Sequence, residues 1–209
     1  PQDDALVEPM EISASTIREA LAAGEITPWY QPQVEFSNGR VVGVEALARW
    51  VRADGHVVPP THFIALLERE GLLEAMTDHM LTQACRDKRR WDQQGLRLTL
   101  SVNVSPTSLT LNSAADRYQR LVEAEGVDPA DVILEITESS VMADAARGLG
   151  VMARLRLKGF GLSIDDFGTG WSSLAQLSQV PFTELKIDPG FVSGAHAQPR
   201  QRAGIEARH

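Results

Sequence analysis

Six stretches of the chain carry the apolar, often alternating pattern that is typical of β-strands. The segments between them place apolar residues three or four positions apart, which predicts helices. The expected strands cover residues 29–36, 40–50, 96–105, 131–138, 161–166 and 183–188, and the expected helices cover 60–71, 73–95, 114–126, 144–159 and 172–179. Strands that alternate with helices in this way indicate right-handed βαβ units and a parallel sheet.

The first two strands break this rule, because only Ser37-Asn38-Gly39 separates them. Asn-Gly is a strong hairpin signal, so these strands should be antiparallel. We therefore expect an α/β fold, a TIM-like (β/α) barrel whose first strand is antiparallel. Such a barrel typically takes about 250 residues, and the 209 residues here leave about six strands, without the last two. A doubly wound open sheet is the alternative, but no glycine-rich dinucleotide-binding turn is present.

The organisation of the chain is expected to be one main domain, 26–209, preceded by a linker and helix at 1–25. This approach segment is acidic at first and then helical. The chain opens on Pro1 without an initiator methionine, which suggests an excised fragment. The helix at 15–24 would suit a linker from an upstream receiver or other sensor domain.

Composition narrows the class of partner. The net charge is -8 and no basic cluster is present, so a nucleic-acid polymer is not expected as partner. No apolar run approaches the roughly 18 residues of a membrane span, and no signal peptide opens the chain. The single cysteine, Cys85, excludes an internal disulfide and fits a reducing compartment. A cytoplasmic location is expected.

Polar side chains interrupt five successive strands near their carboxyl ends. They are Glu45, Asn103, Glu135, the pair Asp165-Asp166, and Lys186. In parallel α/β proteins the carboxyl ends of the strands meet at one edge, where functional groups gather. Alternate residues of a strand share a face, so Ser101 points with Asn103 and Ser163 with Asp165.

These residue types favour a divalent cation. Carboxylate and amide oxygens suit Mg²⁺ or Mn²⁺, and the adjacent pair Asp165-Asp166 could let one carboxylate bridge two ions. Lys186 could orient water or shuttle a proton, and Arg49 is placed to bind a phosphate. Plainer roles also fit: Asn103 as a helix cap, Asp166 bound to loop amides, Lys186 as an ion-pair partner of Asp165 or Glu135, and Gln31 and Arg49 as surface residues.

Six motifs resemble the EAL-domain phosphodiesterases and occur in the order of that family. They are QP at 31–32, EALARW at 45–50, NVS at 103–105, LEITES at 134–139, DDFGTG at 165–170 and LKID at 185–188. The family hydrolyses cyclic di-GMP to linear pGpG with two Mg²⁺ or Mn²⁺ ions, on a barrel with one antiparallel strand. The resemblance therefore implies a metal-dependent phosphodiesterase of bacterial second-messenger signalling.

The same resemblance assigns residue roles. One metal would be held by Glu45, Asn103, Glu135 and Asp165, and a second by Asp165 and Asp166. Lys186 would act with Glu45 and Asp165 in catalysis, on the attacking water. Gln31 and Arg49 would contact the dinucleotide. Glu138 would steady the loop 167–172, which in the family couples metal binding to dimer contacts, so a homodimer is a possible assembly.

The chain also departs from the family pattern. Family site residues that follow the LKID motif have no counterpart before His209, and Trp171 replaces the usual tyrosine. Two alternatives to the enzyme therefore stay open. One is a degenerate receptor that binds cyclic di-GMP without cutting it. The other is an interaction scaffold whose edge strand, 183–188, pairs with another chain. The retained Glu45 and aspartate pair favour the enzyme.

Overall fold

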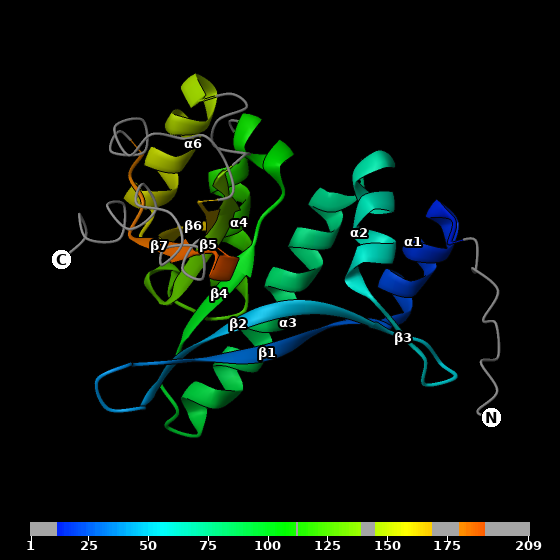
Figure 1. Cartoon of the computed structure of the whole chain (residues 1–209), viewed down its shortest axis with the longest axis horizontal. Coiled ribbons are helices and arrows are strands. Elements are labelled where there is room, and N and C mark those ends of the chain that lie inside the picture. Colours follow the sequence, from blue (N-terminus) through cyan, green and yellow to red (C-terminus); the bar gives the residue numbers. More distant parts are fainter. Residues whose placement is uncertain (1–11, 112, 139–144, 169–179, 191–209) are drawn as a thin grey trace.

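A computed structural model describes residues 12–111, 113–138, 145–168 and 180–190 of the chain. Within these ranges a curved sheet carries helices along its length (Figure 1). In this view helices α1 and α2 lie above the hairpin β1–β2, α3 crosses behind it, and the remaining strands follow towards β7 (Figure 1). The arrangement agrees with the expected α/β fold, a TIM-like barrel that is incomplete.

The sheet has seven strands, and its main path runs β1-β2-β4-β5-β6-β7. The strands are β1 (Ile26–Val34), β2 (Val41–Val51), β3 (Val57–Val58), β4 (Thr99–Asn103), β5 (Val132–Thr137), β6 (Gly161–Phe167) and β7 (Glu184–Ile187). β1 and β2 are antiparallel, and every pairing from β2–β4 to β6–β7 is parallel. The predicted hairpin and the predicted parallel sheet are both confirmed.

β3 was not predicted. Its two residues pair antiparallel with Trp50 and Val51 at the end of β2. Two valines have too little sequence to show an alternating pattern, and the strand exists because the turn at Gly55, with φ +83°, brings the chain back onto β2. Among the described strands, β1 and β7 each pair with only one neighbour.

The helices follow the predicted order, and the four described helices after α1 end two residues earlier than predicted. They are α1 (Ala14–Ala23), α2 (Pro60–Arg69), α3 (Leu73–Gln93), α4 (Ala114–Ala124) and α6 (Ala145–Leu157), with 3₁₀ turns at Pro106–Thr110 and Pro129–Asp131. The helix expected at 172–179 lies outside the described residues. No helix in the described ranges is both long enough and apolar enough to span a bilayer.

The two faces of the sheet differ in chemistry. Alternate strand residues such as Leu100, Leu134 and Ile164 join helix side chains in one buried apolar cluster. The residues between them form the opposite face, which carries the buried polar side chains of Ser101, Glu135 and Ser163. This alternation places the polar strand residues together on the inner side of the curved sheet.

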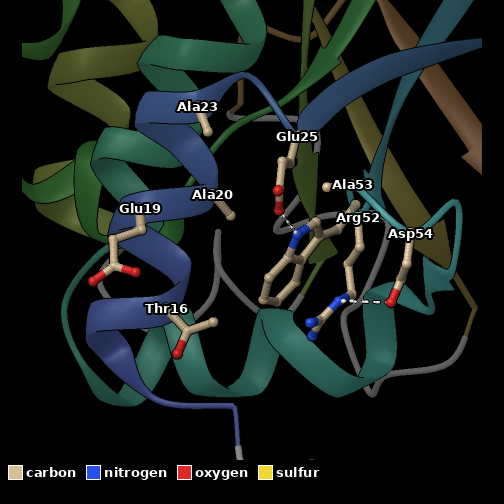
Figure 2. A pocket seen from close by; sticks show the side chains of 9 residues that line it. Thr16, Glu19, Ala20, Ala23, Glu25, Arg52, Ala53 and Asp54 are labelled. Atoms are coloured by element: carbon tan, nitrogen blue, oxygen red, sulfur yellow. Dashed lines mark hydrogen bonds and ion pairs between the residues drawn. The ribbon is translucent and has the colours of Figure 1, made fainter.

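Helix α1 packs onto this domain although it lies in the predicted approach segment. Its Ile17 and Ala20 are buried, and Ser13 caps its first turn by accepting a hydrogen bond from the Thr16 N–H at 3.2 Å. After the helix, Glu25 accepts a hydrogen bond from the Trp50 indole N–H at 2.9 Å. A hollow of about 330 Å³ lies between α1 and the end of β2 (Figure 2). The upstream domain itself stays a prediction.

Candidate metal centre

The strand register brings the predicted polar residues to one end of the inner face. Glu45 on β2 lies opposite Gln31 of β1 and Ser101 of β4. Asn103 pairs with Glu135 of β5, and Thr137 pairs with Asp165 of β6. Residues that are up to 141 positions apart in sequence therefore become neighbours.

Three carboxylates form the centre of the site. Ligand oxygens of Glu45, Glu135 and Asp165 all lie within 4.8 Å of one another. Lys186 reaches the same point from β7, and its Nζ lies 2.9 Å from Glu45 Oε2, 3.0 Å from Glu135 Oε2 and 3.3 Å from Asp165 Oδ2. One ammonium group thus contacts three carboxylates, which leaves an excess of negative charge.

Burial and neighbouring charges shift the pKa values of Glu135 and Lys186. Glu135 is 1% exposed, and burial raises its pKa from 4.5 to about 7, against the attraction of the Lys186 ammonium and with the help of the charge on Glu45. Burial opposes the charge on Lys186, but the carboxylates of Glu135 and Glu45 prevail and raise the pKa of this lysine. Lys186 is therefore a permanent cation at the centre of the site.

Asn103 joins the cluster through its side-chain amide. Its Nδ2 donates to Glu45 Oε1 at 3.3 Å. This bond orients the amide and leaves its oxygen as a neutral acceptor beside the carboxylates. The structure therefore brings Glu45, Asn103, Glu135, Asp165 and Lys186 together at one place.

Asp166 lies next to this group rather than in it. Its backbone has φ +55°, a left-handed conformation that non-glycine residues rarely adopt, and its N–H donates to Asp165 Oδ1 at 3.0 Å. Burial, followed by the charges of Asp165 and Asp188, raises the pKa of Asp166. Because of this left-handed backbone, the side chains of Asp165 and Asp166 leave the chain in different directions.

Glu138 fastens the end of β5 to the turn after β6. It is 3% exposed, and its Oε2 accepts a hydrogen bond from the Gly168 N–H at 3.0 Å. Gly168 has φ +105°, which requires glycine. The bond is placed to hold the start of the loop that begins at Phe167.

Gln31 and Arg49 lie on the hairpin beside Glu45. Gln31 is exposed, and Arg49 sets its guanidinium 6.0 Å from the centre of the Trp29 ring while Nη1 donates to the Ala48 carbonyl at 2.8 Å. Arg49 and Asn103 also border a hollow of about 390 Å³ between the strand ends and helices α2 and α3. Its apolar walls include Leu47, Ile64 and Met76.

Sequence reasoning missed part of this site. Lys186 was considered an ion-pair partner of Asp165 or Glu135, and the structure shows that it contacts both of them and Glu45 as well. The contribution of α2 and α3 to the hollow gave no signal in the sequence, because Ile64 and Met76 resemble any core residue of an amphipathic helix.

The residues present fit a divalent cation. Glu135 Oε1 is buried and has no hydrogen-bond partner within the described ranges, so it is a carboxylate oxygen with free coordinating capacity. All the donors in the cluster are hard oxygen ligands, which suit Mg²⁺ or Mn²⁺ better than a soft metal. The acidic group of Glu45, Glu135 and Asp165 could therefore hold a metal ion.

Comparison with known proteins identifies relatives that align with most of this chain. RocR of Pseudomonas aeruginosa, a cyclic di-GMP phosphodiesterase, is 34% identical over 195 residues that cover 93% of this chain and 50% of that protein. DosP of Escherichia coli, an oxygen sensor protein, is 35% identical over 209 residues, which cover 99% of this chain and 26% of DosP. The chain thus spans between a quarter and a half of these relatives.

Solved structures show the same fold. The MucR phosphodiesterase in complex with c-di-GMP matches with a TM-score of 0.83 at 36% identity, over 92% of this chain and 78% of that one. The EAL enzyme Bd1971 in its cGMP-bound form matches with a TM-score of 0.81 at 31% identity, over 92% of this chain and 54% of that one. The EAL domain family matches residues 14–207. The chain therefore belongs to the EAL domain family.

Proposed function

We propose that this domain hydrolyses one phosphodiester bond of cyclic di-GMP and releases linear pGpG. The observation that carries the proposal is the convergence of Glu45, Glu135 and Asp165 within 4.8 Å in an EAL domain whose relatives include cyclic di-GMP phosphodiesterases. In the reaction, a water oxygen bonds to phosphorus, the P–O3′ bond breaks, and O3′ leaves with a proton.

Divalent Mg²⁺ or Mn²⁺ would be held by Glu45, Asn103, Glu135 and Asp165, with Asp166 beside Asp165 for a second ion. Such an ion supplies Lewis acidity to the phosphate and to water. Glu45 and Glu135 contribute charge from two strands, and the hydrogen bond from Asn103 to Glu45 fixes the direction of one carboxylate. Glu138 keeps the turn after Asp166 in place through Gly168.

Lys186 and the hairpin residues would act on substrate and water. The Lys186 ammonium lies within 3.3 Å of all three carboxylates, so it can donate to a water or phosphate oxygen that enters the centre. Arg49 borders the 390 Å³ hollow, where its guanidinium can bind a phosphate while the apolar walls cover a base. Gln31, exposed opposite Glu45, can donate or accept at the ribose or phosphate.

The test is hydrolysis by the purified chain with Mn²⁺ or Mg²⁺, followed by chromatographic separation of pGpG. We expect product from the wild type and none from Glu45→Ala. The matched control is Glu35→Ala, because Glu35 belongs to the same hairpin but pairs with Arg40 at 3.2 Å near its turn. Absence of product from the wild type, or equal rates for Glu45→Ala and Glu35→Ala, would refute the proposal.

A second candidate is a receptor that binds cyclic di-GMP without cutting it. The observation in its favour is Lys186, whose ammonium contacts all three carboxylates and offsets part of their negative charge. Calorimetry separates the two functions: cyclic di-GMP binding with no pGpG, at saturating Mn²⁺, would support the receptor.

We also propose that the domain acts as one module of a longer signalling protein, since the aligned segment covers only 50% of RocR and 26% of DosP. A sensor or receiver domain would then control access to the site. The homodimer expected from the family resemblance is tested by analytical ultracentrifugation of the purified chain with and without cyclic di-GMP.

A further inference from the structure

Ser163 is a fully buried serine on β6. It is 0% exposed, and its Oγ has no hydrogen-bond partner within the described ranges. Its neighbours in β6, Leu162 and Ile164, belong to the apolar cluster beneath the helices. Because strand residues alternate, Ser163 lies on the inner face together with Asp165.

The register partner of Ser163 on β5 is Glu135, and its partner on the other side, on β7, is Glu184. Because Ser163 and Glu135 are register partners on parallel strands, their side chains rise from the same face of the sheet. Glu135 uses Oε2 to bind Lys186 at 3.0 Å, whereas its Oε1 is buried without a hydrogen-bond partner. A free donor and a free acceptor thus occupy adjacent strands at the same level.

Leaving such groups unpaired is unfavourable, because a buried polar group without a partner has lost its hydrogen bonds to water and gained none in return. The comparison with Ser101 is informative, because it is equally buried on the inner face and its hydroxyl accepts a hydrogen bond from Gln33 Nε2 at 3.3 Å. The inner face therefore does pair its other fully buried serine. Ser163 lies between Glu184 of β7, which is exposed, and Glu135 of β5, whose Oε1 is buried and unpaired within the described residues, so Glu135 offers the buried acceptor at its level.

We propose that Ser163 is a positioning residue, whose hydroxyl donates to Glu135 Oε1, directly or through one buried water, when Glu135 holds a divalent cation. The two side chains already rise from the same face of the sheet at the same level, so this bond requires little rearrangement. Ser163 then fixes the direction of the metal-holding carboxylate in the way that outer-shell partners of metal ligands do. The inference rests on the metal site of the proposed function.

The experiment is a calorimetric titration with Mn²⁺, combined with thermal melting in EDTA. The variants are Ser163→Ala and, as control, Ser108→Ala, which also removes a fully buried hydroxyl but one that already accepts a bond from Arg117 at 3.4 Å. We expect Ser163→Ala to raise the Mn²⁺ Kd about tenfold and to leave the Tm in EDTA unchanged or higher. Ser108→Ala should lower the Tm and leave the Kd unchanged.

The outcomes are separable. Equal Mn²⁺ Kd values for the wild type and Ser163→Ala would overturn the inference and leave the proposed function standing. A Tm in EDTA that falls as far in Ser163→Ala as in Ser108→Ala would also overturn it, because it would show a purely structural hydroxyl. Mn²⁺ binding that weakens as expected in a chain that forms no pGpG would support the inference while refuting the proposed phosphodiesterase.

Discussion

Replacing Glu135 by glutamine tests the electrostatics of the cluster most directly. The side chain is 1% exposed, and its pKa rises from 4.5 to about 7 because burial disfavours the charged form. A carboxyl group whose pKa is raised by folding stabilises the protein fully below its unfolded pKa. That contribution is lost as the pH rises through the folded value, here between 4.5 and about 7.

The magnitude follows from the two pKa values. The difference between 4.5 and about 7 corresponds to about 3 kcal/mol. Glutamine keeps the shape of the side chain and never ionises, and Lys186 retains its contacts with Glu45 and Asp165. Without metal, the stability of Glu135→Gln relative to the wild type should therefore increase by about 2.5 kcal/mol between pH 5 and pH 8, because pH 5 already lies above the unfolded pKa of 4.5.

Urea unfolding in EDTA at pH 5 and pH 8 measures this difference. The control is Ile133→Val, which changes the same strand and removes no titrating group, so its effect on stability should be the same at both pH values. Addition of Mn²⁺ at pH 8 should stabilise the wild type and leave Glu135→Gln unaffected. A relative stability of Glu135→Gln that stays constant or decreases with pH would refute the reasoning.

Three further predictions concern residues away from the cluster. Burial raises the pKa of the Cys85 thiol to about 12 and covers it completely, so a chromogenic disulfide reagent should modify it only after urea unfolding. Lys88→Met removes a buried ammonium that lies 3.1 Å from both Asp92 and Asp131, and should lower the free energy of unfolding by about 3 kcal/mol in urea titrations. Trp50→Phe removes the hydrogen bond from the indole N–H to Glu25, and should lower the free energy of unfolding by about 2 kcal/mol or more in the same assay.

Much of the architecture is encoded locally. The Asn-Gly turn defined the antiparallel hairpin because only a few residues fit its backbone, and the alternation of strands and helices defined the parallel sheet. The period of two within strands also put Asn103 and Asp165 on the same face as their serine neighbours. These features depend on residues within a few positions of each other, which is why the sequence alone determined them.

Other features depend on how distant segments pack. The contacts of Lys186 with three carboxylates, the complete burial of Glu135, and the placement of Ser163 opposite it all require the relative register of β2, β5, β6 and β7. No local pattern specifies that register, because it results from the packing of helices over the outer face of the sheet. The sequence therefore predicted which groups would form the site, and only the tertiary structure decided which carboxylate oxygens contact the Lys186 ammonium, since that depends on distances between residues far apart in the chain.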